Sequence, residues 1–203
     1  MKQGFYPKAG KRAVDLLLTL PALVVAVPVC LVLGIGIRSS MGSPILFRQQ
    51  RPGRDGTSFT LFKLRSMSAG NAPDAERLTR LGNWLRRTSL DELPELVNVL
   101  RGDMSLVGPR PLLPEYLELY DEHQSRRHDV LPGITGWAQV NGRNRLDWAE
   151  RLKADVWYTE NMSLKLDLGI LLRTLGMMVR REGIEAAGHA TMPKFEGSRR
   201  KPS

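Results

Sequence analysis

The sequence predicts a mainly helical α+β fold, in which a membrane element at the N-terminus precedes one compact domain. Three observations support this class. Residues 16–37 form an uncharged apolar run, residues 45–48 and 59–64 have the composition of paired strands, and much of the remainder shows apolar residues at helical spacing. A chain of 203 residues suits one domain with an appendage. We expect residues 1–40 to form the anchor, residues 41–197 the main domain, and residues 198–203 a basic, disordered tail.

The apolar run Leu16–Ile37 is long enough to cross a bilayer, because a straight helix of 22 residues rises about 33 Å. It is too long for the apolar part of a usual signal peptide, so we interpret it as a retained membrane element. Pro21 and Pro28 interrupt it and basic residues flank both ends, which the positive-inside bias disfavours for a spanning helix. The residues alone leave two alternatives open: a spanning helix, or a helix broken near Pro28 that enters and leaves by the cytoplasmic face.

The next segment predicts a β-hairpin from 45–48 and 59–64, joined by the Gly- and Arg-rich sequence RPGRDGTS. Arg51 and Arg54 in this loop belong either to a solvated turn or to a surface that lies on anionic lipid headgroups. Lys63 and Arg65 alternate, so both can face one side of a strand. Helices are predicted at 78–87, 112–123, 146–161 and 163–182, the last one either packed in the core or lying on lipid.

The segment Thr88–Pro111, TSLDELPELVNVLRGDMSLVGPRP, joins an acid pair to a stiffened arginine. Its Thr-Ser pair offers favourable N-cap residues and its leucines and valines recur at helical spacing, so we expect a helix to begin near Asp91 and Glu92. Asp91 would then lie in the positive field of a helix N-terminus. The plainest alternative is that Asp91 only caps the helix and Glu92 is a first-turn acid. The two prolines around Arg110 favour chemistry, because a carboxylate near a rigidly held guanidinium suits phosphate groups.

Composition narrows the possible partners. The chain has 30 basic and 21 acidic residues, a net charge of +9 and a pI near 10.1, which predicts an anionic partner. The basic residues are spread along the chain without a recognisable reading motif, which argues against nucleic acid and leaves an anionic lipid membrane or a phosphorylated substrate. A lone Cys30 and three histidines without zinc-binding spacing give no disulfide framework and no Cys- or His-based metal site.

The stretch DELPELVNVLRGDMSLVGPRP resembles the signature of the bacterial sugar transferases known as monotopic phosphoglycosyl transferases, and further matching motifs run from Lys11-Arg12 to about Phe195. The chain is similar to the minimal, catalytic-core members. The resemblance implies transfer of a phospho-sugar from a UDP-sugar to undecaprenyl phosphate, a membrane polyprenol phosphate, with release of UMP. It implies a ping-pong mechanism in which Asp91 forms an aspartyl-phosphosugar, as the first membrane step of glycoconjugate assembly at the cytoplasmic face of the bacterial inner membrane.

The same resemblance assigns roles to individual residues. The implied catalytic acids are Asp91 and Glu92, and Asp91 is the implied ligand of Mg²⁺, an ion that takes one or two carboxylates together with substrate phosphates. The implied contacts to phosphate, nucleotide or polyprenol phosphate are Lys63, Arg86, Arg110 and Arg143. The final GHATMPKFEG resembles the branch that uses UDP-N,N′-diacetylbacillosamine, beside acetylated hexosamines generally.

For the anchor, the resemblance implies the re-entrant helix-break-helix, whose entrance matches Lys11-Arg12-x-x-Asp15. Val27-Pro28 stands where members of the family carry Ser-Pro, and valine lacks the hydroxyl that can satisfy carbonyls freed by the break. The rival hypothesis is a non-catalytic, membrane-tethered binder of anionic lipid or nucleotide. It explains the charge and the anchor but leaves the acid pair without a purpose. The sequence carries no signal of an oligomeric state.

Overall fold

The structure is a computed structural model that describes residues 6–70, 72–142, 146–180 and 194–197. Its helices are α1 (Lys11–Met41), α2 (Asp74–Arg77), α3 (Arg80–Arg87), α4 (Glu95–Arg101), α5 (Glu122–Ser125), α6 (Trp137–Val140), α7 (Trp148–Asn161) and α8 (Leu164–Arg180). Its strands are β1 (Leu46–Pro52), β2 (Ser58–Leu64), β3 (Ser105–Val107) and β4 (Gly133–Thr135). A π-helical turn precedes α1 and short 3₁₀ turns join several elements. The predicted class, a mainly helical α+β fold, is confirmed.

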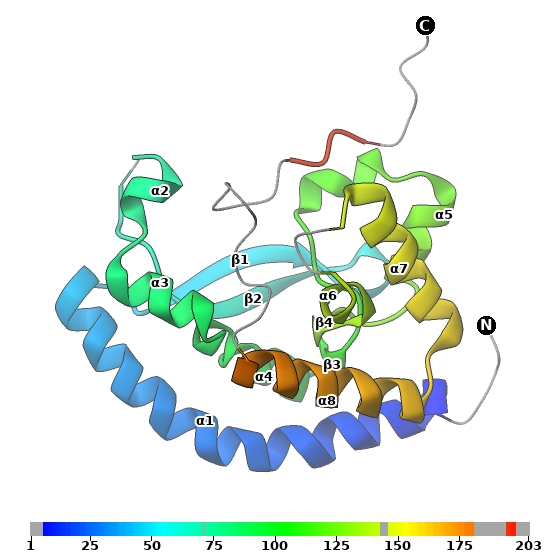
Figure 1. Cartoon of the computed structure of the whole chain (residues 1–203), viewed down its shortest axis with the longest axis horizontal. Coiled ribbons are helices and arrows are strands. Elements are labelled where there is room, and N and C mark those ends of the chain that lie inside the picture. The colour runs from blue at the N-terminus through cyan, green and yellow to red at the C-terminus, as the bar shows by residue number, and fades with distance from the viewer. Residues whose placement is uncertain (1–5, 71, 143–145, 181–193, 198–203) are drawn as a thin grey trace, which may run out of the picture.

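Helix α1 runs as an arc along one side of the molecule (Figure 1) and continues through Pro21 and Pro28 for 31 residues. The predicted break at Val27-Pro28 is therefore not seen, and the two limbs form one curved helix. Each proline removes one helical hydrogen bond, and both lie on the exposed side, where a helix can curve to absorb the change. Among the described helices, α1 is the one long and apolar enough to cross a membrane.

Both ends of α1 are attached to the same body. At its start, Lys11 Nζ lies 2.6 Å from a carboxylate oxygen of Asp167 in α8, and the Arg12 guanidinium donates to the last carbonyls of α4 at 2.5 and 2.8 Å. At its end, Arg65 donates to two backbone carbonyls just beyond the helix, both at 2.8 Å. Between these attachments many apolar side chains are exposed, Val24 by 76%, whereas Ala26 and Ile37 are buried against the domain.

The predicted hairpin is confirmed as β1 and β2, which pair antiparallel from Leu46 opposite Leu64 to Pro52 opposite Ser58. Its inner face is apolar, and Phe59 and Leu61 pack with Val99 of α4 and with Met104. In β2 burial alternates through Phe59 and Leu61, as expected for a strand covered on one face, whereas β1 is exposed along most of its length.

A second, parallel pair was not predicted from the sequence. Ser105 of β3 pairs with Gly133 of β4, and Val107 pairs with Thr135. The two segments approach closely because they meet through glycines: a Cβ added at Gly133 would lie 2.0 Å from the backbone nitrogen of Gly108. This crossing fixes the turn-rich segment near residue 133 against the segment that leads into Arg110.

Most predicted helices are found at their expected places. The prediction for 78–87 corresponds to α3, the prediction for 146–161 to α7, and the prediction for 163–182 to α8. The single helix predicted for 112–123 is wrong. The chain forms a 3₁₀ turn from Pro114 to Leu119 and then starts α5 afresh, because Asp121 and Gln124 make a reciprocal capping box.

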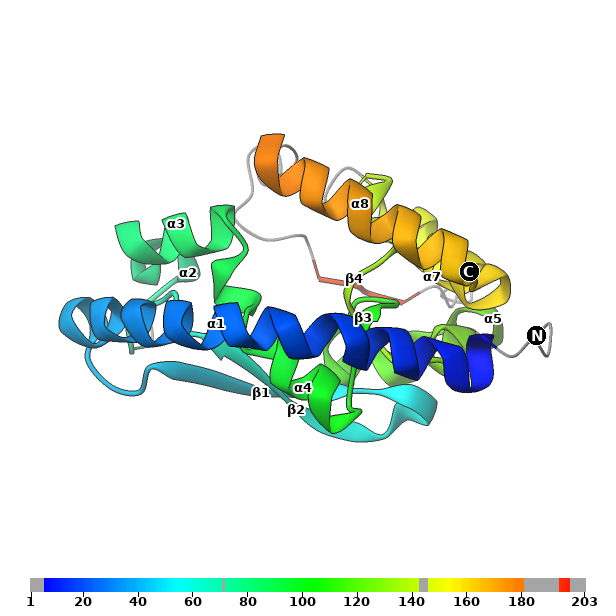
Figure 2. The same ribbon diagram turned by 90° about the horizontal axis from the view of Figure 1, so that it is seen from below.

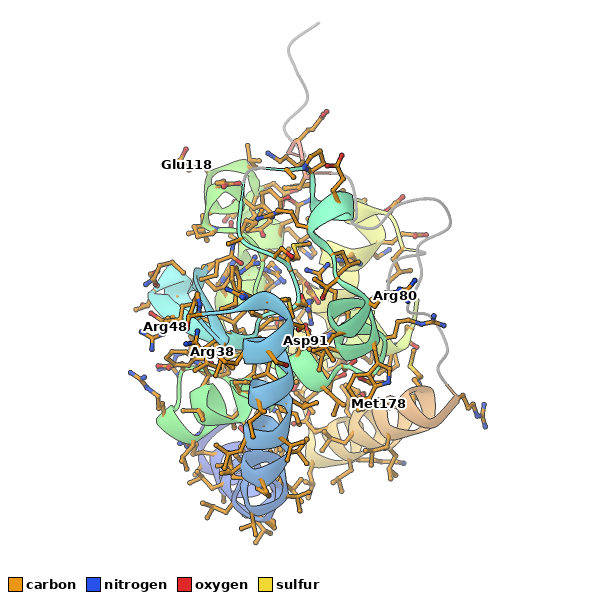
Figure 3. All side chains as sticks on the ribbon, turned by 90° about the vertical axis from the view of Figure 1, so that its left-hand side faces the viewer. Arg38, Arg48, Arg80, Asp91, Glu118 and Met178 are labelled. Carbon is orange, nitrogen blue, oxygen red and sulfur yellow. The ribbon has the colours of Figure 1, made fainter. Side chains whose placement is uncertain are left out.

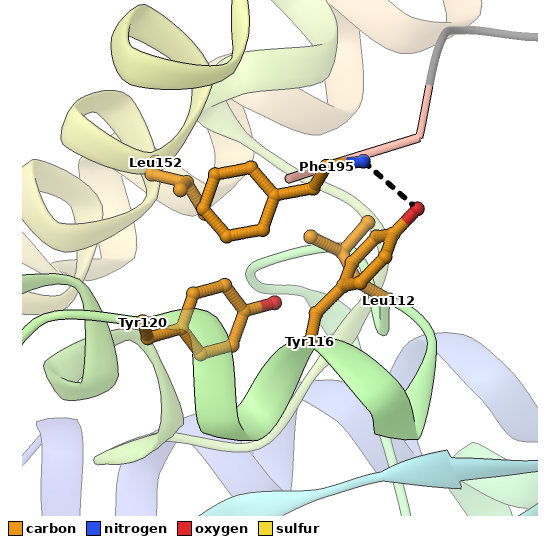
Figure 4. Close-up of a cluster of buried hydrophobic side chains, with 5 residues drawn as sticks. All are labelled: Leu112, Tyr116, Tyr120, Leu152 and Phe195. Carbon is orange, nitrogen blue, oxygen red and sulfur yellow. Dashed lines mark hydrogen bonds between the residues drawn. The ribbon is translucent and has the colours of Figure 1, made fainter. Parts of the chain in front are cut away.

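The C-terminal segment Lys194–Gly197 closes one side of the domain. Phe195 packs among Leu112, Tyr116, Tyr120 and Leu152, and its backbone N–H donates to the Tyr116 hydroxyl at 3.2 Å (Figure 4). This cluster draws on three parts of the chain and holds α7 against the segment that follows Arg110.

Helices α1 and α8 lie on the same side of the molecule (Figure 2). Helix α8 buries one face, where Ile170 is 1% exposed, and leaves a row of large apolar side chains exposed on the other. That row consists of Leu164, Leu168, Leu172, Leu175 and Met178. The two predicted alternatives for this helix, core helix and surface helix, thus each describe one of its faces.

Candidate active site

The two predicted catalytic acids lie in a short 3₁₀ turn, Leu90–Glu92, and not in the first turn of a helix. Ser89 has a left-handed backbone (φ 55°) and makes no capping hydrogen bond, and α4 begins only at Glu95, after Pro94. The predicted helix start at the acid pair and the alternative in which Asp91 caps it are therefore both wrong. Pro94 explains the shift, because a proline is tolerated at a helix start but not within it.

Instead of capping, the Glu92 side chain turns toward two cations. Its Oε1 lies 2.7 Å from Lys63 Nζ and 2.6 Å from Arg110 Nη2. Lys63 comes from β2 and Arg110 from the segment after β3, so the hairpin and the β3–β4 crossing together set this geometry. Charge-assisted hydrogen bonds of this kind are about twice as strong as neutral ones.

A third carboxylate, Glu95, completes the group and was missed as a site residue. Its Oε1 lies 3.1 Å from Lys63 Nζ and its side chain is 2% exposed. Burial raises the pKa of Glu95 to about 7, although the charge of Lys63 acts against that rise. The signal available in the sequence was its spacing: Glu95 follows Glu92 by three residues in the same acidic motif. We call Lys63, Asp91, Glu92, Glu95 and Arg110 the acid site.

The two acids of the pair differ in their electrostatics. Burial would raise the pKa of Glu92, but the charges of Arg110 and Lys63 outweigh it and hold that pKa far below its usual range. The pKa of Asp91 is raised, first by burial and then by the neighbouring charge of Glu92. Asp91 has no hydrogen-bond partner among the described residues, and it lies inside the molecule between the hairpin side, marked by Arg48, and the α8 side, marked by Met178 (Figure 3).

Arg86 of α3 faces the same site. Its Nε donates to the Ser66 hydroxyl at 2.9 Å, and its charge is among those that lower the pKa of Asp91. The structure thus brings Lys63, Arg86 and Arg110 together around the acid pair. The phosphate-binding roles that the resemblance implies for them stay predictions. Arg143 lies outside the described residues.

A pocket of about 440 Å³ opens beside the acid pair. Arg86, Glu92 and Arg110 line one part of it, and aliphatic side chains of α4, β3, β4 and α8 line much of the rest. Asp155 of α7 lines it as well and was not predicted as a site residue. Its carboxylate accepts from Arg127 at 2.7 Å, and Arg127 also donates to the backbone carbonyl of Arg110 at 2.6 Å. A buried acid at a core position of α7 was the available signal.

The described residues can hold a hard cation only with the help of a substrate. No group of three or more His, Cys, Asp or Glu side chains suited to a metal occurs in the described part of the chain. Mg²⁺ does not require one, since it takes one or two carboxylates and completes its shell with phosphate oxygens and water. The carboxylate of Asp91, buried and without a hydrogen-bond partner in the described structure, fits that role.

Comparisons with known proteins identify relatives of this chain. The model of the bacterial sugar transferase family matches residues 6–181. The chain is 53% identical over 168 residues to the uncharacterized sugar transferase EpsL of Bacillus subtilis (strain 168), covering 80% of this chain and 83% of that protein. It is 37% identical over 196 residues to the undecaprenyl-phosphate galactose phosphotransferase of Salmonella typhimurium, covering 85% of this chain and 41% of that protein.

A third relative is the UDP-glucose:undecaprenyl-phosphate glucose-1-phosphate transferase of Escherichia coli (strain K12). The identity is 40% over 181 residues, which cover 81% of this chain and 39% of that protein. The match therefore spans most of EpsL but less than half of the two longer relatives. From the family model and these identities, the chain belongs to the bacterial sugar transferase family.

Proposed function

We propose that this protein transfers a phospho-sugar from a UDP-sugar to a membrane polyprenol phosphate, undecaprenyl phosphate, and releases UMP. The observation that carries the proposal is the unlike pair at the centre of the acid site: Glu92 is neutralised by two cations, while Asp91 is buried beside it without a hydrogen-bond partner among the described residues. A carboxylate left free in this way can act as a nucleophile toward phosphorus. The names of the relatives favour the same class of substrates.

In the first step, an oxygen of Asp91 attacks the β-phosphorus of the UDP-sugar. The bond from that phosphorus to the oxygen bridging the two phosphates breaks, and UMP leaves with that oxygen. In the second step, a phosphate oxygen of the polyprenol phosphate attacks the same phosphorus. The acyl-phosphate bond breaks, Asp91 regains its carboxylate, and the lipid carries the sugar on a diphosphate. Lys63, Arg86 and Arg110 stabilise the negative charge on the phosphoryl oxygens in both steps.

Glu92 acts in this scheme mainly by holding cations. Because Arg110 and Lys63 keep it ionised, it positions both cations beside the acid pair, with Arg110 in the lining of the pocket. Mg²⁺, bound through Asp91 and substrate oxygens, would supply further neutralisation of the diphosphate. Chelation with EDTA should stop turnover and added Mg²⁺ should restore it; full activity after exhaustive chelation would remove the ion from the mechanism.

We further propose that α1 dips into one leaflet from the cytoplasmic face of the bacterial inner membrane. Support comes from its attachments, since Lys11 at one end and the carbonyls beyond Met41 at the other both bind the same body. A spanning α1 would have to release one of them. Single cysteines near Lys2 and near Ser43, in a Cys30→Ser background, should both be protected from a membrane-impermeant thiol reagent in intact cells. Labelling of the Lys2 site alone would show that α1 spans.

The deciding experiment measures UMP release by the purified protein with Mg²⁺, a polyprenol phosphate and a panel of UDP-sugars. The panel includes UDP-glucose and UDP-galactose, after the named relatives, and acetylated hexosamines such as UDP-N,N′-diacetylbacillosamine. We expect release with at least one donor and a phospho-sugar adduct on the peptide that contains Asp91. Binding of UDP-sugars without any release of UMP would favour the rival, a non-catalytic binder.

A further inference from the structure

We infer that the pocket beside the acid site receives the phosphate and the first prenyl units of the acceptor lipid. The inference rests on the proposed function and adds to it a place for the second substrate. It is carried by three properties of the pocket: the aliphatic surface of its walls, the arginines at one part of its lining, and the position of its lip on the exposed apolar row of α8.

The walls suit a branched aliphatic chain. Leu171, Leu175 and Met178 line the pocket from one stripe of α8. Facing aliphatic side chains come from Leu96 and Ile134, and no aromatic side chain lines the pocket among the described residues. The polar groups on these walls are few: the hydroxyls of Thr135 and Thr174 bond to each other at 2.7 Å, and Gln139 donates to the carbonyl oxygen of Ile134 at 3.0 Å. The side-chain oxygen of Gln139 has no partner among the described residues, and it can only accept a hydrogen bond. Such walls offer burial of apolar surface rather than a pattern of donors for a base.

The cationic part of the lining suits a phosphomonoester. Arg110 already pairs with Glu92, so its charge is largely compensated. Arg86 donates to a serine hydroxyl and forms no ion pair with a carboxylate in the described part of the chain, so it provides a surplus positive charge in the lining. Glu92, the chain neighbour of Asp91, lines the same pocket, so a phosphate held there would lie next to the acid pair, where the second step of the proposed reaction needs it.

The lip of the pocket connects it to the apolar surface. Leu175 and Met178 both line the pocket and are exposed, by 60% and 41%. They belong to the exposed row of α8, which lies on the side of the molecule that carries α1 (Figure 2). A long prenyl chain can therefore leave the pocket over this lip without crossing into water. A nucleoside diphosphate gains nothing from such an exit, because it has no apolar tail.

The test compares two leucines of α8. Leu175 lines the lip, whereas Leu172 is 70% exposed on the same helix and does not line the pocket. Equilibrium dialysis measures binding of farnesyl phosphate, a short prenyl phosphate, to the full chain in detergent. Leu175→Gln should weaken binding about tenfold, which corresponds to about 1.4 kcal/mol, and Leu172→Gln by less than about twofold. Met178→Gln serves as a second variant of the lip and should act like Leu175→Gln.

Two further probes separate head from tail. Inorganic phosphate should bind equally to the wild type and to Leu175→Gln, whereas farnesol should show the same loss as farnesyl phosphate. Equal weakening by Leu175→Gln and Leu172→Gln would mean that only the general apolar surface matters and would overturn the inference. So would unchanged binding in both lip variants.

The dialysis also distinguishes this inference from the proposed reaction. If the wild type releases UMP from a UDP-sugar but the lip variants bind farnesyl phosphate normally, the pocket assignment fails and the reaction stands. If farnesyl phosphate binding depends on Leu175 but no UDP-sugar is consumed, the pocket stands and the reaction fails. In an active wild type, Leu175→Gln should raise the KM for the polyprenol phosphate more than it lowers kcat.

Discussion

Two buried ionic networks in this protein look alike in composition but differ in how completely their carboxylates are bonded. In the anchor network, formed by Tyr6, Lys11, Tyr158 and Asp167, both oxygens of the buried Asp167 accept hydrogen bonds. In the acid site, one oxygen of Glu92 takes two cations while Asp91 has no hydrogen-bond partner among the described residues. The closed network holds α1 to α8. The open one keeps a carboxylate free for a ligand, at a cost in stability.

The largest effect should come from the free carboxylate. Asp91→Asn should lower the rate of UMP release at least about 1,000-fold, or about 4 kcal/mol in barrier, because the nucleophile of the proposed reaction is lost. It should not lower the thermal unfolding temperature, since it removes a buried charge next to Glu92. Glu92→Gln should reduce turnover strongly while folding is retained. Near-wild-type UMP release by Asp91→Asn would refute the nucleophile assignment.

A change in the anchor network should have the opposite effect, lowering stability while turnover is retained. Asp167→Asn should lower the free energy of unfolding by about 3 kcal/mol, because it leaves Lys11 buried with its main partner neutralised. UMP release per folded molecule should change little. Chemical denaturation in detergent measures the loss. In the double variant Lys11→Met with Asp167→Leu the loss should be smaller, since no charge then remains unpaired; an equal or larger loss would show that the pair does not behave as a closed unit.

The sequence predicted the two networks to different extents, for a physical reason. Lys63, Glu92 and Arg110 lie in local motifs that resemble those of the bacterial sugar transferases, so the resemblance implied their roles before their contacts were known. Asp167 could not be paired with Lys11 in the same way, because its partner lies 156 residues away and its own segment reads only as an apolar helix.

The same distinction explains the errors in the fold. Hairpin β1–β2 is encoded by alternation and a Gly-rich turn, whereas β3 and β4 have three residues each and meet only through a glycine crossing. The start of α4 was misplaced because Pro94 outweighed the capping pattern around Ser89. Periodicity therefore located the elements, and competition between neighbouring signals decided their ends.

His128 is an intermediate case, a buried polar side chain that is only half bonded. Its Nδ1 lies 3.0 Å from the carbonyl oxygen of Gly53, and its Nε2 has no partner among the described residues. Burial, and then the charge of Arg127, lower the pKa of His128 from 6.5 to about 4. The neutral ring therefore stabilises the folded state above pH 6.5, and this contribution is lost as the pH falls toward 4.

The expected loss over that range is up to about 3 kcal/mol in the free energy of unfolding. Denaturation at several pH values in detergent measures it, and His128→Gln should remove this part of the pH dependence. His123→Gln, at an exposed position, is the matched control and should leave the pH dependence as in the wild type. Identical curves for the wild type and His128→Gln would show that the ring is not held neutral by its surroundings.

The smallest effect is expected at an exposed ion pair that neighbours a buried one. Arg126 lies 2.7 Å from Glu160, with both side chains about two-fifths exposed, while the adjacent Arg127 lies 2.7 Å from Asp155 with both almost fully buried. Water screens the first pair and side-chain entropy opposes it, so Arg126→Gln should change the free energy of unfolding by less than about 1 kcal/mol, and by less still in high salt. Arg127→Gln should cost about 3–5 kcal/mol, because it leaves Asp155 buried without its cation. The two pairs have the same N–O distance and join the same two parts of the chain, so contact distance alone predicts the same loss in both variants. A similar loss would therefore contradict the view that burial and complete bonding decide how much an ionic contact contributes to the stability of this protein.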